Sequence, residues 1–260
     1  MSKCCLLCQQ PLQQQMSLQQ FLAFRPMKWE VLCERCQEGL GAYSAQACVC
    51  TGCGRPLVAS GQGDRYQQIA WRNPMDQTQC YCEDCANWCQ RVPLEWVRHQ
   101  ALFDYTPLCQ EWLHRYKYLA DSRLAQVGCT ALQQYAKAHR HALWLVLPSS
   151  PTSLAERGFH ATFELVAQAG LAVLCPFDYI GDGQKQAYKT KAERLALRQP
   201  FALNVVELTQ LKAREWVLFD DVYTTGATLM AAKQLLYPLA EKQGVSVQSI
   251  SLVRNSLNQY

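Results

Sequence analysis

Short apolar runs alternate with amphipathic stretches over the C-terminal two thirds of the chain. Continuous apolar runs such as 142–147 and 216–219 are typical of strands buried on both faces of a parallel sheet. The pattern predicts strands at 142–147, 171–175, 216–219 and 245–253, and helices at 107–119, 122–138, 160–169 and 227–243. This alternation predicts an α/β fold, in which a parallel sheet is flanked by helices.

The first 92 residues lack this periodicity and are rich in cysteine instead. Twelve of the 15 cysteines lie before residue 90. We therefore predict a small cysteine-rich module over residues 1–92 and the α/β domain over residues 93–260. No apolar run has the length of a signal-peptide core or of a bilayer-spanning helix. This predicts a cytoplasmic protein without membrane insertion, in which thiols stay reduced and structural disulfides are disfavoured.

Four C-x-x-C pairs explain most of these cysteines. Two residues between ligands let one tight turn aim both sulfurs at one ion, and two such turns complete a tetrahedral site. A redox pair would need a thioredoxin-like setting, and the spacing does not match a ferredoxin cluster. The predicted ligands of two structural zinc ions are Cys5, Cys8, Cys33, Cys36, Cys50, Cys53, Cys82 and Cys85.

The pairing of the four C-x-x-C turns stays open at this level. We prefer sequential pairing, with the first four cysteines on one zinc ion and the next four on the other, over a crossed arrangement. Cys4 or Cys80 could also replace a neighbour as ligand. In every arrangement four thiolates leave no open coordination position, so the zinc is structural and metal binding holds the module together.

Composition and charge add limits rather than a function. Hydrophobic residues make up 49% and charged residues 18% of the chain, which predicts a packed core and argues against disorder. The formal net charge of +4 is too small to indicate a nucleic-acid-binding protein. Two zinc ions held by eight thiolates would bring it to about zero. Any attraction to anions must therefore be local, and residues 91–200 carry the positive excess.

The motif with the clearest chemistry spans residues 217–228, where a buried strand ends in Asp220 and Asp221 and a turn of small and hydroxyl residues leads into a helix. Free amides at a helix N-terminus form an anion site. The two carboxylates would repel a phosphate at contact, so sugar hydroxyls, with a magnesium ion, are their natural partners. A ribose 5-phosphate satisfies the whole motif, although an ordinary strand–turn–helix with a capping threonine is the alternative.

The motif resembles the phosphoribosyl pyrophosphate (PRPP) loop of type I phosphoribosyltransferases. The whole chain, from residue 5 to about residue 254, resembles the ComF/GntX family, bacterial proteins that join zinc ribbons to a phosphoribosyltransferase-like domain. The resemblance is carried by the four C-x-x-C turns, the 50–57 form of the third turn, the stretch Tyr116-Lys117-Tyr118 with Asp121, residues 156–159 and residues 186–201.

The resemblance implies roles for individual residues. Asp220 and Asp221 would hold the ribose hydroxyls as the catalytic pair, with magnesium bound to PRPP. Residues 148–157, including Arg157, would stand in place of the pyrophosphate loop, and residues 181–200 in place of a mobile loop that brings Lys189, Lys191 and Arg194. The residues expected to wrap the 5-phosphate are Thr224, Thr225, Gly226, Ala227 and Thr228.

The chain departs from the family pattern in the pyrophosphate region. The family usually has basic residues at the positions of Thr152 and Ser153, and asparagine at the position of His160. The segment after Arg194 is one residue short and lacks an expected asparagine. These departures weaken pyrophosphate binding and turnover more than 5-phosphate binding. A capping or packing role is favoured over general-base catalysis for His160.

Two functions follow from the resemblance. In the first, the protein is a competence factor for natural transformation that binds PRPP and handles incoming single-stranded DNA with a competence helicase or another uptake protein. In the second, it is an active phosphoribosyltransferase that moves ribose 5-phosphate to a nitrogen nucleophile and releases pyrophosphate. The side chains that could stack on bases and pair with phosphates, or merely pad the zinc module, are Arg65, Tyr66, Trp71, Arg72, Trp88 and Arg91.

Overall fold

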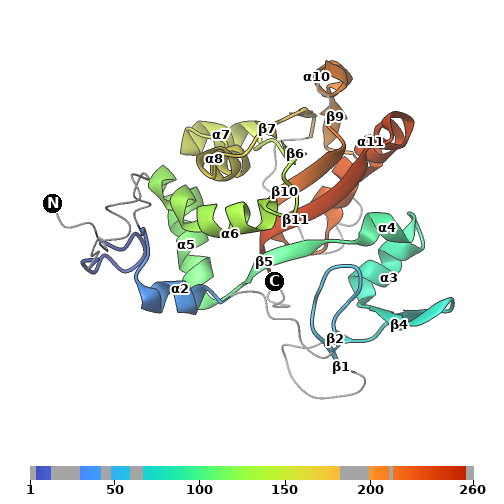
Figure 1. Cartoon of the computed structure of the whole chain (residues 1–260), viewed down its shortest axis with the longest axis horizontal. Helices are drawn as coiled ribbons and strands as arrows, with labels where there is room; N and C mark the ends of the chain where they lie inside the picture. The colour runs from blue at the N-terminus through green and yellow to red at the C-terminus, as the bar shows by residue number, and fades with distance from the viewer. Residues whose placement is uncertain are drawn as a thin grey trace, which may run out of the picture.

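The computed structural model describes residues 4–12, 30–41, 48–58, 67–181, 199–210 and 213–255. At its centre lies a five-stranded parallel sheet in the order β5-β11-β10-β6-β7 (Figure 1). The predicted α/β fold is confirmed. The strands are β5 (Gln100–Asp104), β6 (Ala142–Val146), β7 (Val173–Leu174), β10 (Glu215–Tyr223) and β11 (Ser246–Arg254).

Both faces of the sheet are buried, which explains the continuous apolar runs. In β10, Val217 and Phe219 face one hydrophobic core, whereas Trp216 and Leu218 face the other. The helical elements of the first core are α5 (Pro107–Tyr118), η1 (Ser122–Ala125), α6 (Gln126–Ala136) and α8 (Ala161–Gln168). The long helix α11 (Ala227–Gln243) covers the second face.

Several elements differ from the sequence prediction. The helix predicted at 122–138 is a 3-10 turn followed by α6, which ends at Ala136. Further elements are the short helix α7 (Pro151–Arg157), the antiparallel pair β8 (Phe177–Tyr179) and β9 (Phe201–Leu203), and the helix α10 (Val205–Gln210). Most of the loop predicted at 181–200 lies outside the described residues, including Lys189, Lys191 and Arg194.

The cysteine-rich part forms two lobes that pack on opposite faces of the sheet. The first cysteine lobe comprises residues 4–12 and 30–41, with α2 (Glu34–Leu40), and shares the core around Trp112 of α5. The second cysteine lobe comprises residues 48–58 and 67–99, and shares the core beneath α11. Figure 1 shows α2 beside α5 and the second lobe well apart from it. The second lobe holds β1 (Leu57–Val58), β2 (Gln67–Gln68), β3 (Trp71–Asn73), β4 (Asp76–Tyr81), α3 (Glu83–Cys89) and α4 (Leu94–Val97).

The described helices include none that could cross a bilayer, because none is both long and apolar enough.

Candidate functional site

The two acids of the motif lie at the carboxyl edge of the sheet. Strand β10 pairs with β6 only as far as Phe219, whereas it pairs with β11 as far as Tyr223. The sequence predicted that the strand ends at the two acids. In the structure both acids lie inside β10, which continues to Tyr223. Because the pairing of β6 with β10 ends at Phe219, the residue before the acids, Asp220 and Asp221 have a neighbouring strand on the β11 side only. Their side chains border a cavity there.

The two carboxylates have different electrostatic surroundings. Asp221 Oδ2 lies 2.5 Å from Lys117 Nζ, in an ion pair whose side chains are only 13% and 19% exposed. Asp220 Oδ1 accepts a hydrogen bond from the Asp221 amide at 2.8 Å. Burial raises the pKa of Asp220 to about 7, and the neighbouring Asp221 carboxylate acts in the same direction. One carboxylate is therefore compensated by a lysine, while the other favours a cation or a hydroxyl partner.

This raised pKa predicts a pH-dependent penalty on folding. An aspartate in an unfolded chain has a pKa of about 3.9. The folded state therefore binds the Asp220 proton more tightly, and stability falls as the pH rises from about 4 to about 7. Asp220→Asn should remove this penalty. Its stability relative to the parent should rise by about 1–2 kcal/mol across that window, a value reduced for partial solvation. Urea unfolding of both proteins at several pH values measures the difference, and a constant difference would contradict the prediction.

The predicted phosphate-binding turn, residues 224–228, follows directly on β10. Gly226 has φ 80° and precedes the first residue of α11. The first intrahelical bond runs from the Met230 amide to the Gly226 carbonyl at 2.8 Å, so the amides of residues 227–229 precede it. The Ala227 amide donates to Thr225 Oγ1 at 3.4 Å. With the positive end of the helix dipole, these amides and the threonine hydroxyls can receive an anion.

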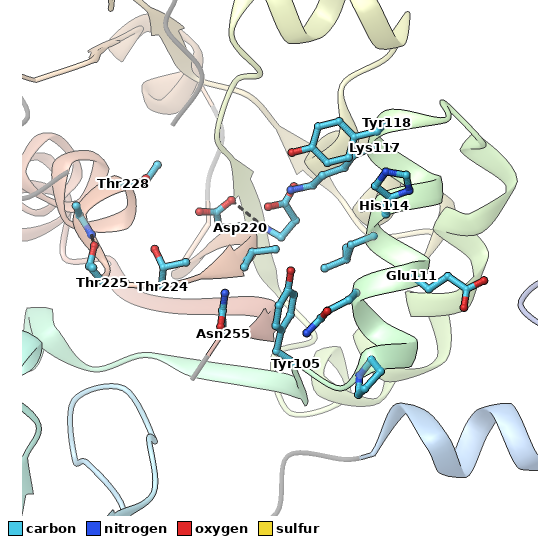
Figure 2. Close-up of a pocket in the computed structure, with 16 residues that line it drawn as sticks. Tyr105, Glu111, His114, Lys117, Tyr118, Asp220, Thr224, Thr225, Thr228 and Asn255 are labelled. Carbon is cyan, nitrogen blue, oxygen red and sulfur yellow. Dashed lines mark hydrogen bonds and ion pairs between the residues drawn. The ribbon is translucent and has the colours of Figure 1, made fainter. Parts of the chain in front are cut away.

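The acids and the turn line one cavity of about 760 Å³. Figure 2 shows Asp220, Thr224, Thr225 and Thr228 on one side of it, and side chains of α5 on the other. That volume exceeds what a ribose 5-phosphate needs, so the α5 side leaves room for more. The residues on the α5 side include Tyr105, Pro107, Gln110, Glu111, Leu113, His114, Lys117 and Tyr118, and Asn255 lies near the turn.

The eight cysteines predicted as ligands form two tetrads in sequence order. One contains Cys5, Cys8, Cys33 and Cys36, and the sulfurs of each tetrad all lie within 4.8 Å of one another. The other contains Cys50, Cys53, Cys82 and Cys85. One sulfur pair in each tetrad, Cys8 with Cys33 and Cys53 with Cys82, is 3.6 Å apart. A tetrahedral ion with Zn–S bonds of about 2.3 Å needs sulfurs about 3.8 Å apart. Both tetrads therefore fit a structural zinc ion, and sequential pairing holds for both.

Known proteins resemble this chain over most of its length. It is 33% identical over 175 residues to the competence protein ComFC of Streptococcus pneumoniae, a match that covers 66% of this chain and 74% of that protein. The chain belongs to the ComF family. It is also 25% identical over 256 residues to ComFC of Bacillus subtilis, which covers 96% of this chain and 95% of that protein. A scan against protein-family models finds no match.

The ComF resemblance implies a ligand-binding role for Arg157, and the structure places this residue beside the end of α5. Arg157 is not among the residues that line the described cavity. Its Nε donates to the Lys117 carbonyl at 2.9 Å, and its guanidinium lies 6.0 Å from the Phe159 ring centroid. Arg157 thus supports the end of α5 that carries Lys117. His160 precedes α8 and its Nδ1 accepts from the Ser149 amide at 3.4 Å, as a packing residue would.

Sequence reasoning gave no role to several residues of this ComF-family site. Lys117 was noted only as part of a family motif, and its ion pair with Asp221 depends on the docking of α5 against β10. Tyr105, His114 and Asn255 carry no local signal, since each reaches the cavity from a different segment of the chain. A basic residue within the 116–118 motif was the one hint that sequence offered.

Proposed function

We propose that this ComF-family protein is a competence factor that binds PRPP, or a closely related ribose 5-phosphate, at the described cavity. One observation carries the proposal: Asp220, which has no ion-pair partner in the described structure, and the threonine-rich turn before α11 border the same cavity. Two relatives bear the name competence protein ComFC, which supports a function in competence. A cytoplasmic location fits the intracellular ligand.

The 5-phosphate and the ribose of the ligand have matching groups in this site. The amides of residues 227–229 and the hydroxyls of Thr224 and Thr228 would bind the 5-phosphate. Asp220 and Asp221 would accept hydrogen bonds from the ribose 2- and 3-hydroxyls. A magnesium ion, when bound with PRPP, would neutralise the diphosphate, and Asp220 offers it a hard oxygen ligand. Lys117 supplies a positive charge beside the acids.

The same geometry also favours a second candidate, phosphoribosyl transfer. The cavity continues past the acids to Tyr105, Gln110 and His114, which leaves space for an acceptor next to the ribose. Catalysis would then rest on positioning and on electrostatic stabilisation of the leaving pyrophosphate. The departures at Thr152 and Ser153, where the family usually has basic residues, count against rapid turnover.

Single-stranded DNA and an uptake protein such as a competence helicase are the proposed partners. Of the candidate stacking residues, Trp88 is buried and fits the padding alternative, and Trp71 is half-buried against Tyr81. Arg72 and Arg91 are exposed and could meet phosphates. Two further candidates, Arg65 and Tyr66, lie outside the described residues.

Calorimetric titration with PRPP and magnesium tests the proposed ligand. The parent protein should bind PRPP, and Asp220→Ala together with Asp221→Ala should weaken binding at least about a hundredfold, because the ribose and the metal lose both carboxylates. Glu111→Ala, which removes a carboxylate on the α5 side of the cavity, is the matched control and should change affinity little. Absence of PRPP binding to the parent would refute PRPP as the ligand of this cavity.

Two further measurements separate the candidate functions. Release of pyrophosphate from PRPP with a panel of nucleobases would favour the transferase, whereas binding without release would favour the competence factor. In the organism that encodes this protein, an allele with both Asp220→Ala and Asp221→Ala should lower the frequency of natural transformation while growth stays normal. Salt-dependent binding of labelled single-stranded DNA to the full chain tests the DNA partner.

A further inference from the structure

We propose that the second cysteine lobe holds the phosphate-binding turn in its ligand-binding shape, with Trp88, Tyr223 and Arg254 as positioning residues. The lobe would then be part of the ligand site rather than a separate structural appendage. This role rests on the proposed function, since the ligand concerned is the 5-phosphate bound by that turn. It predicts that integrity of one metal site controls phosphate binding at another place in the fold.

Trp88 makes the most direct contact between the lobe and the turn. It lies on α3 three residues after Cys85, so both side chains project from the same side of one helical turn. Its indole Nε1 donates a hydrogen bond to the Thr225 carbonyl at 3.0 Å, across 137 residues of sequence. Trp88 and Thr225 are only 7% and 8% exposed. Breaking this buried hydrogen bond would leave the carbonyl of the turn without that donor.

A second connection runs from the tetrad through Arg254 and Tyr223. The buried guanidinium of Arg254 donates to the Cys53 carbonyl at 3.2 Å and lies 4.7 Å from the centroid of the Tyr223 ring. The other face of that ring stacks on His99, with centroids 4.1 Å apart. Tyr223 also lies directly against the turn, because a Cβ on Gly226 would clash with the Tyr223 hydroxyl. The Tyr223 ring therefore packs against the turn at Gly226.

Helix α11, which carries the amides of the turn, is tied to the same lobe. Lys233 of α11 is only 2% exposed, and its Nζ donates to the carbonyls of Trp96 and Arg98. His99 N donates to the Gly52 carbonyl at 2.6 Å, between the cysteines of the third C-x-x-C turn. Hydrogen bonds made by Arg254, Trp88 and Lys233 thus join the tetrad region to the strand end, the turn and the helix.

The first cysteine lobe supports a different wall of the cavity. Several of its hydrogen bonds to the α/β domain go to α5 and to the residue before it. Arg115 donates to the carbonyls of Leu6 and Leu7 at 3.0 and 2.8 Å, and Thr106 donates to the Gly39 carbonyl at 3.2 Å. These hydrogen bonds reach α5, whereas the hydrogen bond from Trp88 of the second lobe reaches the phosphate-binding turn.

Trp88→Phe tests this role, because it keeps an aromatic ring but removes the donor to Thr225. Trp96→Phe is the matched control: it removes an indole N–H from the same lobe that has no hydrogen-bond partner in the described structure. Trp88→Phe should weaken PRPP and ribose 5-phosphate about fivefold and leave pyrophosphate unchanged, while Trp96→Phe leaves all three unchanged. Both variants should retain two metal ions. Equal ribose 5-phosphate affinities in the two variants would overturn the proposal.

Hydrogen exchange supplies a readout that needs no ligand. The amides of residues 225–230 should exchange about fivefold faster in Trp88→Phe than in Trp96→Phe, at equal metal content. If Trp88→Phe fails to fold, Tyr223→Phe replaces it as the test. This variant keeps the stacked ring, removes only the hydroxyl next to Gly226, and should speed the exchange of the same amides. Unchanged exchange would overturn the positioning role, whereas absence of PRPP binding with changed exchange would refute only the proposed ligand.

Discussion

Cys85→Ser should lower the metal content from the two ions predicted for the parent to one, and unfold the second cysteine lobe. Cys85 is fully buried at the start of α3, in a tetrad whose sulfurs lie within 4.8 Å of one another. A serine hydroxyl is a poor substitute for a thiolate on zinc, and the three remaining buried cysteines cannot complete a tetrahedral site. Structural zinc contributes about 10–16 kcal/mol to small zinc peptides. We therefore expect a loss of stability on the order of 5 kcal/mol, among the largest effects of a single substitution.

Elemental analysis and thermal unfolding of the purified full chain measure this effect. The parent should carry two zinc ions per chain and Cys85→Ser one, with a much lower melting temperature. Cys89→Ser is the matched control on the same helix, since Cys89 is outside the tetrad and burial raises its pKa to about 12, which keeps it a neutral thiol. The control should retain both ions. Equal metal content in the two variants would refute the second zinc site.

The predicted fold and the observed one agree best where a segment is buried on both sides. The run at 216–219 needed no partner to be identified as a central strand, and it lies in the middle of β10. Helix α11 begins and ends at the predicted residues, because Gly226 and Gly244 adopt left-handed conformations at its two ends. Strand β5 was missed, since an edge strand pairs on one side only and its sequence mixes polar Gln100 and Asp104 with apolar residues.

The candidate site divides in the same way between local and distant contributions. The acids and the proposed phosphate-binding turn come from one continuous stretch, so the sequence alone was enough to predict that they lie together. Lys117, Tyr105 and Asn255 reach the same cavity only through tertiary packing. The placement of the two cysteine lobes on opposite faces was also unpredicted, because few apolar residues in each lobe indicate which core they will join.

Gly226→Ala should weaken ligand binding at the proposed phosphate-binding turn at least about a hundredfold. Gly226 has φ 80°, a backbone conformation that costs an alanine about 1 kcal/mol. The added methyl would also clash with the Tyr223 hydroxyl and lie 2.9 Å from the ring carbon that carries it. Tyr223 is buried between His99 and Arg254 and cannot move aside without disturbing both. The turn must shift instead, and overpacking of this kind costs about 1–3 kcal/mol more.

Gly244→Ala separates the clash from the backbone strain. Gly244 ends the same helix with φ 65°, and no atom lies within 4 Å of a Cβ built there. It should therefore lose only about 1 kcal/mol of stability and bind PRPP like the parent. Gly226→Ala should weaken PRPP at least about a hundredfold, because the amides of residues 227–229 move with the turn. Titration of both variants with PRPP and with ribose 5-phosphate decides the matter: equal affinities would mean that the turn does not hold the phosphate. A selective loss in Gly226→Ala would assign the 5-phosphate to the start of α11, where the glycine is needed for space as well as for its backbone conformation.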